Sequence, residues 1–182
     1  MDTPLTRLQA YIRIRTDHPK PNYADAVSFF ATYAARCPAL TFTTRELVPG
    51  HPLAVLTLPG LEPAAPALVL SGHMDVVPAE QEKWTVPAVE GTVVGDRVYG
   101  RGSQDMKASQ LMYCEALMNL IASRGGAPFR RTVHILAVPD EEIGGARGMQ
   151  AVLGNSELVS FLNPGMLIDE GLASPSDKFS GP

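Results

Sequence analysis

Four clusters along the chain carry the side chains that bind divalent cations in proteins. The clusters contain one histidine and several carboxylates, in chain order His73, Asp75, Asp105, Glu141, Glu142, Asp169 and Glu170. Imidazole and carboxylate ligands suit zinc, and a carboxylate that bridges suits two metal ions ~3.5–4 Å apart. If folding gathers these groups, their like charges repel unless cations neutralise them. The clusters therefore predict a metal centre, on condition that the fold brings them together.

The first cluster follows the apolar run at residues 67–70 and has the form His73-x-Asp75. Side chains two residues apart on a strand lie on the same face, so the two groups can act together. We expect His73 to bind a metal through one ring nitrogen. We expect the Asp75 side chain to accept the proton of the other ring nitrogen and so fix the tautomer.

Each cluster also has a simpler explanation when it is taken alone. A histidine at a strand end is commonly a hydrogen-bonded structural residue, and Asp105 before a helix can be an N-cap. Glu141 and Glu142 can be solvated loop charges, and the acidic pair before Gly171 can belong to a turn. All four explanations together require four coincidences at the boundaries of predicted elements, which favours the metal centre.

The elements that must position these clusters follow from hydrophobic periodicity and from proline and glycine breaks. Helices are expected from Thr3–Pro4 to about residue 12, over 23–35, over 106–124 and over 146–153, strands over 41–48, 53–58, 67–72, 132–138 and 166–169, and a hairpin over 89–99. Helices alternating with apolar strands predict an α/β fold with a largely parallel sheet. In such sheets ligands lie at the carboxyl ends of the strands, where three of the four clusters fall.

Length and composition set limits on the kind of protein. The chain has 182 residues, is 45% hydrophobic and 19% charged, and carries a net charge of −4, as expected of one soluble globular domain. We expect no nucleic-acid partner, because basic residues do not cluster, and no membrane span, because no apolar run approaches ~20 residues. Two cysteines outside any paired motif and an N-terminus without a signal peptide predict a cytoplasmic protein.

Four strings in this order resemble the zinc-dependent aminoacylase and exopeptidase family. They are SGHMDVVP at residues 71–78, VYGRGSQDMK at 98–107, VPDEEIGG at 138–145 and LIDEG at 167–171. The family also contains acetylornithine deacetylase, succinyl-diaminopimelate desuccinylase and the glutamate carboxypeptidases. The resemblance covers residues from about 5 to 178, is strongest to the aminoacylases, and implies a three-layer zinc-exopeptidase-like catalytic domain with a mostly parallel central sheet.

The resemblance implies a role for each site residue. His73 binds one of two Zn²⁺ ions and Glu170 completes its set, Asp105 bridges both ions, and Glu142 binds the second ion. Asp75 orients His73, and Glu141 is the general base that moves the proton. A cis peptide bond is implied between Asp105 and Met106. Trp84 lines the substrate mouth or packs in the structure, and Arg147 either meets a substrate carboxylate or is a surface charge.

The implied activity is hydrolysis of the amide bond of N-acyl-L-amino acids, small molecules that yield an amino acid and a short carboxylate. The family is homodimeric. Its lid and dimerisation domain and its C-terminal catalytic segment, with a second metal-binding histidine, have no counterpart within residues 1–182. We therefore expect the N-terminal part of a catalytic domain with impaired activity. The alternatives are an inactive fragment or pairing partner of a full-length homologue, or a related dipeptidase or deacylase.

Overall fold

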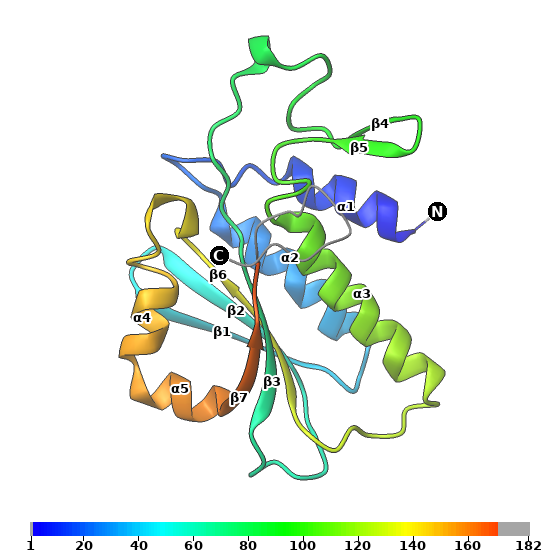
Figure 1. Ribbon diagram of the computed structural model, residues 1–182, viewed down its shortest axis with the longest axis vertical. Helices are drawn as coiled ribbons and strands as arrows, with labels where there is room; N and C mark the ends of the chain where they lie inside the picture. The colour runs from blue at the N-terminus through cyan, green and yellow to red at the C-terminus, as the bar shows by residue number, and fades with distance from the viewer. Residues whose placement is uncertain (1, 171–182) are drawn as a thin grey trace, which may run out of the picture.

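The central sheet has five strands in the order β1-β2-β6-β3-β7 in the computed structural model, which describes residues 2–170 (Figure 1). The strands are β1 Thr41–Val48, β2 His51–Leu58, β3 Ala67–His73, β6 Val133–Val138 and β7 Pro164–Ile168. Strand β3 pairs in parallel with both β6 and β7, whereas β2 is antiparallel to β1 and β6. The expected α/β fold with a mostly parallel sheet is confirmed.

Helices cover both faces of this sheet and make three layers (Figure 1). One layer holds α1 Pro4–Arg13, α2 Tyr23–Arg36 and α3 Lys107–Ser123, and the other holds α4 Met149–Gly154 and α5 Ser156–Leu162. A separate hairpin, formed by β4 Thr92–Val94 and β5 Arg97–Tyr99, precedes α3. The three long helices, the hairpin and all five strands lie where the sequence predicts them, within a few residues.

Alternation along β2 shows how one strand serves two cores. Leu53 and Val55 pack with the α4–α5 layer, whereas Ala54, Leu56 and Leu58 pack with the α1–α3 layer. Successive strand side chains point to opposite faces, so a sheet covered on both sides needs apolar residues at every position. This explains why the central strands carry nearly continuous apolar runs.

The region after β6 differs from the sequence prediction. The helix expected over 146–153 begins only at Met149, and the sequence analysis did not predict α5. Gly148, the residue before the helix, has non-helical backbone angles (φ −106°, ψ −109°), and a Cβ on it would lie 1.9 Å from the carbonyl oxygen of Pro139. The residues of α5 did carry a signal, since Asn155 caps it and Leu158 and Leu162 are one turn apart and buried.

Strand β7 lies at one end of the described sheet, next to β3. Its residues are exposed, and they include the apolar side chains of Met166, Leu167 and Ile168. Within residues 2–170, no helix is both long enough and apolar enough to span a bilayer.

Candidate metal centre

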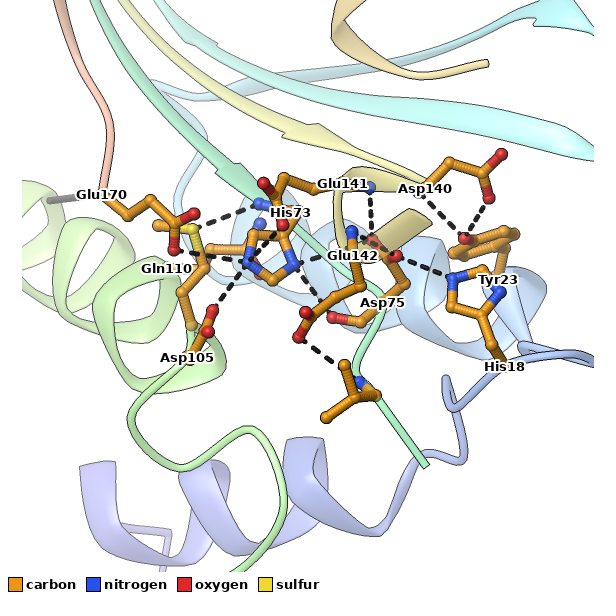
Figure 2. A network of polar contacts seen from close by, with 12 residues as sticks. His18, Tyr23, His73, Asp75, Asp105, Gln110, Asp140, Glu141, Glu142 and Glu170 are labelled. Carbon is orange, nitrogen blue, oxygen red and sulfur yellow. Dashed lines mark hydrogen bonds and ion pairs between the residues drawn. The ribbon is translucent and has the colours of Figure 1, made fainter. Parts of the chain in front are cut away.

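His73 lies at the centre of the acidic side chains (Figure 2). It is the last residue of β3, and only 1% of its surface is exposed. Its Nε2 lies 2.8 Å from Oδ1 of Asp105, 3.4 Å from Oε2 of Glu170 and 3.8 Å from Oε2 of Glu141. Residues from four separate parts of the sequence therefore meet at one ring nitrogen.

Two overlapping triads have the spacing that a metal ion requires. His73, Asp105 and Glu142 form one, and His73, Glu141 and Glu170 form the other; in each triad the donor atoms all lie within 4.8 Å of one another. The donors are one imidazole nitrogen and carboxylate oxygens, which is the chemistry of zinc sites. The residues therefore fit a divalent cation.

The topology explains why these residues meet. Strands β3, β6 and β7 are parallel, so their carboxyl ends reach the same edge of the sheet, where open α/β sheets bind ligands. His73 ends β3, Glu141 and Glu142 follow β6 in a short 3₁₀ turn, and Glu170 follows β7. Asp105 comes from the loop before α3, and its peptide bond to Met106 is cis, as the sequence resemblance implied.

The charges of the site act strongly on one another when no cation is bound. Burial lowers the pKa of His73, but the carboxylates of Asp75 and Glu170 outweigh it and raise that pKa to about 10. The pKa of Glu142 is raised by burial and then by the charge of Asp105. Burial also raises the pKa of Glu170, with Asp105 and Glu141 adding to the effect. The crowded carboxylates therefore raise one another's pKa, a repulsion that a bound cation would relieve.

Asp75 contacts His73 differently from the sequence prediction. The Nδ1 of His73 donates to the backbone carbonyl oxygen of Asp75 at 2.9 Å, whereas the nearest carboxylate oxygen of Asp75 is 3.6 Å away. The backbone therefore fixes the tautomer that presents Nε2 to the acidic groups. The Asp75 carboxylate instead accepts the backbone N–H groups of Glu141 and Glu142, each at 3.1 Å.

His18 is a site residue to which the sequence analysis gave no role. Its Nε2 lies 2.8 Å from Oδ2 of Asp75, beside the two backbone N–H groups that the same carboxylate holds (Figure 2). The sequence gave no usable signal for this contact, because it joins residues 57 positions apart and follows no periodic pattern.

Asp140 anchors the glutamate pair from the other side. Its backbone is left-handed, with φ 66°, and its buried carboxylate accepts the hydroxyl proton of Tyr23 at 2.9 Å. The Tyr23 oxygen in turn accepts the backbone N–H of Asp140 at 3.0 Å. Arg147 forms an ion pair with the same carboxylate, Nε to Oδ2 at 2.7 Å. A structural partner for Arg147 is thus present within the chain.

Lys107 holds the Asp105 loop against the first helix. It is buried, and its Nζ donates to the carbonyl oxygens of Tyr11 and Ile14 at 3.1 and 2.7 Å. Burial lowers the pKa of this ammonium to about 7. Trp84, the other residue singled out for the site, stacks under the guanidinium of Arg101 at 5.5 Å.

Comparison of the sequence with known proteins shows the family of the chain. The family model for peptidase family M20/M25/M40 matches residues 69–178, more than half of the chain. The chain belongs to this peptidase family. The matched span contains His73 and all the carboxylates of the site, from Asp75 to Glu170. Peptidases are hydrolases, so the chain belongs to a family of hydrolytic enzymes.

Curated relatives cover nearly all of the chain. It is 42% identical over 177 residues to aminoacylase-1 of Sus scrofa, an alignment that covers 97% of this chain and 42% of that protein. The human aminoacylase-1 is 40% identical with the same coverage. The chain thus spans about two fifths of the length of the curated M20/M25/M40 relatives that it matches.

Solved structures agree on the fold. An M20 family metallo-carboxypeptidase from Sulfolobus solfataricus superimposes with a TM-score of 0.77 at 20% identity, over 94% of this chain and 38% of the other. Such a distant likeness shows the fold of the family and no more. The metal must therefore be argued from the geometry of the site, and the substrate class from the more similar curated relatives.

Proposed function

We propose that this chain carries metal-binding and proton-transfer groups of a zinc-dependent amidohydrolase that acts on N-acyl-L-amino acids. The observation that carries this proposal is the meeting of His73, Asp105 and Glu142, with donor atoms within 4.8 Å of one another. The similarity to aminoacylase-1 over 97% of the chain supports the substrate class. Because the chain spans 42% of that relative, the activity of a whole protein is part of the proposal.

We assign the metal ligands as His73, Asp105, Glu142 and Glu170, which would hold two Zn²⁺ ions in a complete site. Asp105 suits the bridging position, because it belongs to a triad with Glu142 and also raises the pKa of Glu170. A bound zinc ion would polarise the amide carbonyl and lower the pKa of a water molecule. We also propose that residues 1–182 correspond to the N-terminal part of the catalytic domain.

Glu141 is assigned as the general base. Its side chain is 47% exposed and reaches the edge of the site, with Oε2 3.8 Å from Nε2 of His73, so water and substrate can both reach it. It takes a proton from the attacking water and delivers it to the leaving amine nitrogen as the amide bond breaks. The adjacent Glu142 is directed elsewhere, since its Oε1 accepts the backbone N–H of Val77 at 3.3 Å.

Zinc content and amide hydrolysis test this proposal together. The purified chain is equilibrated with zinc, its bound metal is measured by mass spectrometry, and turnover of N-acetyl-L-methionine is followed. We expect bound zinc. We expect Glu142→Gln to weaken zinc binding at least about tenfold, because a charged ligand is lost. Glu141→Gln should keep the zinc and lower any turnover by about 10²-fold or more.

The exposed residue Glu157 on α5 supplies the matched control, because it lies outside both triads. Glu157→Gln should leave zinc binding and turnover unchanged. A chain that binds no zinc, or that loses zinc equally in the Glu142 and Glu157 variants, contradicts the proposal. Zinc binding decides the metal assignment even where the turnover of the chain is low.

A further inference from the structure

The carboxylate of Asp75 is completely buried and is occupied by three donors. Oδ1 accepts the backbone N–H of Glu141 at 3.1 Å, and Oδ2 accepts that of Glu142 at 3.1 Å. The third donor is Nε2 of His18, 2.8 Å from Oδ2 (Figure 2). A buried carboxylate is stable only when hydrogen bonds replace its lost water, so each of the three donors matters.

Backbone pairing delivers His18 to this place. Asp17 and Val76 form a parallel bridge, in which the N–H of Val76 donates to Thr16 at 3.1 Å and that of His18 donates to Val76 at 3.3 Å. The segment that carries His18 is therefore tied to the residue next to Asp75. Only 12% of the His18 side chain is exposed, so the ring is held where it contacts the carboxylate.

His73 does not take the place of His18 on this carboxylate. Its Nδ1 already donates to the Asp75 carbonyl at 2.9 Å, and it lies 3.6 Å from the nearest carboxylate oxygen. The carboxylate therefore links His18 on one side with the glutamate pair on the other. Two of the three donors to the Asp75 carboxylate belong to the turn that this carboxylate holds. His18 is the donor from outside the turn, so the position of the carboxylate depends on it.

We propose that His18 is a positioning residue that acts through Asp75 on the turn at Glu141 and Glu142. By donating from Nε2, it fixes the Asp75 carboxylate, which in turn fixes both glutamate N–H groups. This arrangement directs Glu142 toward the metal and Glu141 toward the water. The inference deepens the proposed function and rests on it for the roles of the two glutamates.

Amide hydrogen exchange measured by NMR on the metal-free chain tests the link directly. His18→Leu removes the donor, and the exchange of the Glu141 and Glu142 amides should rise about tenfold, because a local opening is no longer resisted. His18→Gln keeps a side-chain N–H donor and should restore most of the protection. Unchanged exchange in His18→Leu, or equal exchange in the two variants, overturns the proposal.

His51 supplies a matched control. Its Nε2 lies 3.5 Å from the Asp140 carboxylate, which is already paired with Tyr23 and Arg147, and it makes no contact with Asp75 among the described residues. His51→Leu should leave the Glu141 and Glu142 amides unchanged. An equal rise in this variant would mean that any histidine near the turn has the same effect, and would overturn the specific role of His18.

Zinc affinity gives a second readout. His18→Leu should weaken zinc binding about tenfold, as the loss of a group that supports a ligand does, and His18→Gln should stay within about threefold of the parent.

If His18→Leu does not fold, the tautomer of His18 in the wild-type chain tests the proposal instead. The proposal requires that the NMR spectrum of the ring nitrogens place the proton on Nε2. A proton on Nδ1 alone contradicts it. Amide exchange needs no zinc, so failure here is distinct from failure of the zinc centre.

Discussion

At the scale of residues, His73 carries the proton that a metal ion must displace. Its pKa of about 10 in the metal-free protein means that the ring is protonated at neutral pH, because Asp75 and Glu170 outweigh the effect of burial. A metal can bind Nε2 only after this proton leaves. The same shift also contributes to stability. The folded pKa lies above the ordinary histidine value of 6.5, so the stabilising contribution of His73 is complete below pH 6.5 and is lost as the pH rises through about 10.

Zinc binding should therefore release about one proton from His73 at pH 7. Calorimetric titration in two buffers of different ionisation enthalpy gives the number of protons released. His73→Asn should remove this release as well as weaken the binding. Zinc binding whose heat is the same in both buffers would show that no protonated ring stands in the site.

At this scale the sequence predicted the residue types better than their contacts. The spacing of His73 and Asp75 indicated that the two act together, and they are neighbours. Which atom of Asp75 meets the ring could not be predicted, because β3 ends at His73 and Asp75, which offers its backbone carbonyl, lies beyond the strand. The role of His18 depends on the bridge between Asp17 and Val76, a non-local pairing that leaves no mark in local sequence.

At the scale of elements, Tyr23 joins the start of α2 to the turn after β6. Its hydroxyl exchanges two hydrogen bonds with Asp140, one with the carboxylate and one with the backbone N–H. Tyr23→Phe should lower the free energy of unfolding by about 1–3 kcal/mol, because buried polar atoms of Asp140 lose their partner. Urea denaturation measures this change.

Tyr113→Phe is the control for that substitution. Among residues 2–170, its hydroxyl makes only a long contact, 3.5 Å from the carbonyl oxygen of Asp169, at the surface. We expect the free energy of unfolding to change by less than about 0.5 kcal/mol. An equal loss of unfolding free energy in the two variants would mean that the Tyr23–Asp140 hydrogen bonds add no stability beyond that of a surface tyrosine hydroxyl.

Two glycines near α4 make a second matched pair. Gly148 lies against Pro139, just after β6, where a Cβ would be 1.9 Å from the Pro139 carbonyl oxygen, whereas a Cβ on Gly154 would meet none of the described residues within 4 Å. Gly148→Ala should cost about 2 kcal/mol or more, since backbone must move. Gly154→Ala should be neutral or stabilise by up to about 1 kcal/mol. Thermal denaturation that ranks them in the opposite order would contradict the close packing.

The elements also show where prediction from sequence stops. Hydrophobic spacing predicted α1, α2 and α3, and the structure shows Thr3 and Asn22 as the N-caps of the first two. The short helix α5 was missed because seven residues give only two buried positions, too few to set a period. The start of α4 at Met149 follows the non-helical backbone of Gly148, which lies against Pro139, a contact that forms only in the folded chain.

At the scale of the whole molecule, one ionic cluster ties the three long helices together. Glu115 on α3 binds Arg7 on α1 through two hydrogen bonds of 2.6 and 2.8 Å, and accepts the hydroxyl of Tyr33 on α2 at 2.7 Å. Burial raises the pKa of Glu115, but Arg7 and Tyr33 outweigh it, and the pKa is lowered. The folded protein therefore favours the ionised carboxylate.

The sign of the resulting pH dependence follows from linkage. The pKa of Glu115 in the folded protein lies below its ordinary value of 4.5. Glu115 therefore stabilises the folded state fully above pH 4.5, and this contribution is lost as the pH falls through the folded pKa. Glu115→Gln should lower the free energy of unfolding by about 1–3 kcal/mol at pH 7 and flatten its dependence on pH below 4.5. Urea denaturation between pH 3 and 7 checks this.

Glu62 provides the comparison on the surface. Its ion pair with Arg130 has a similar length, 2.8 Å, but both side chains are largely exposed. Glu62→Gln should change the free energy of unfolding by less than about 0.5 kcal/mol at any of these pH values. A loss as large as that of Glu115→Gln would contradict the larger stabilisation expected of the partly buried Arg7–Glu115 cluster.

The whole fold also explains why the site could be anticipated. Parallel strands that end at one edge bring distant clusters together, so residues from 73 to 170 meet once β3, β6 and β7 pair. The pairing order itself, with β6 between β2 and β3, could not be predicted because, apart from β1 and β2, neighbouring strands of this sheet are not consecutive in sequence.

Anomalous diffraction at the zinc absorption edge, from crystals of the chain grown with zinc, tests the central assignment most directly. The account predicts a peak about 2.0–2.2 Å from Nε2 of His73 and from a carboxylate oxygen of Asp105. Crystals that bind zinc only elsewhere on the molecule, with no peak beside His73, would contradict it.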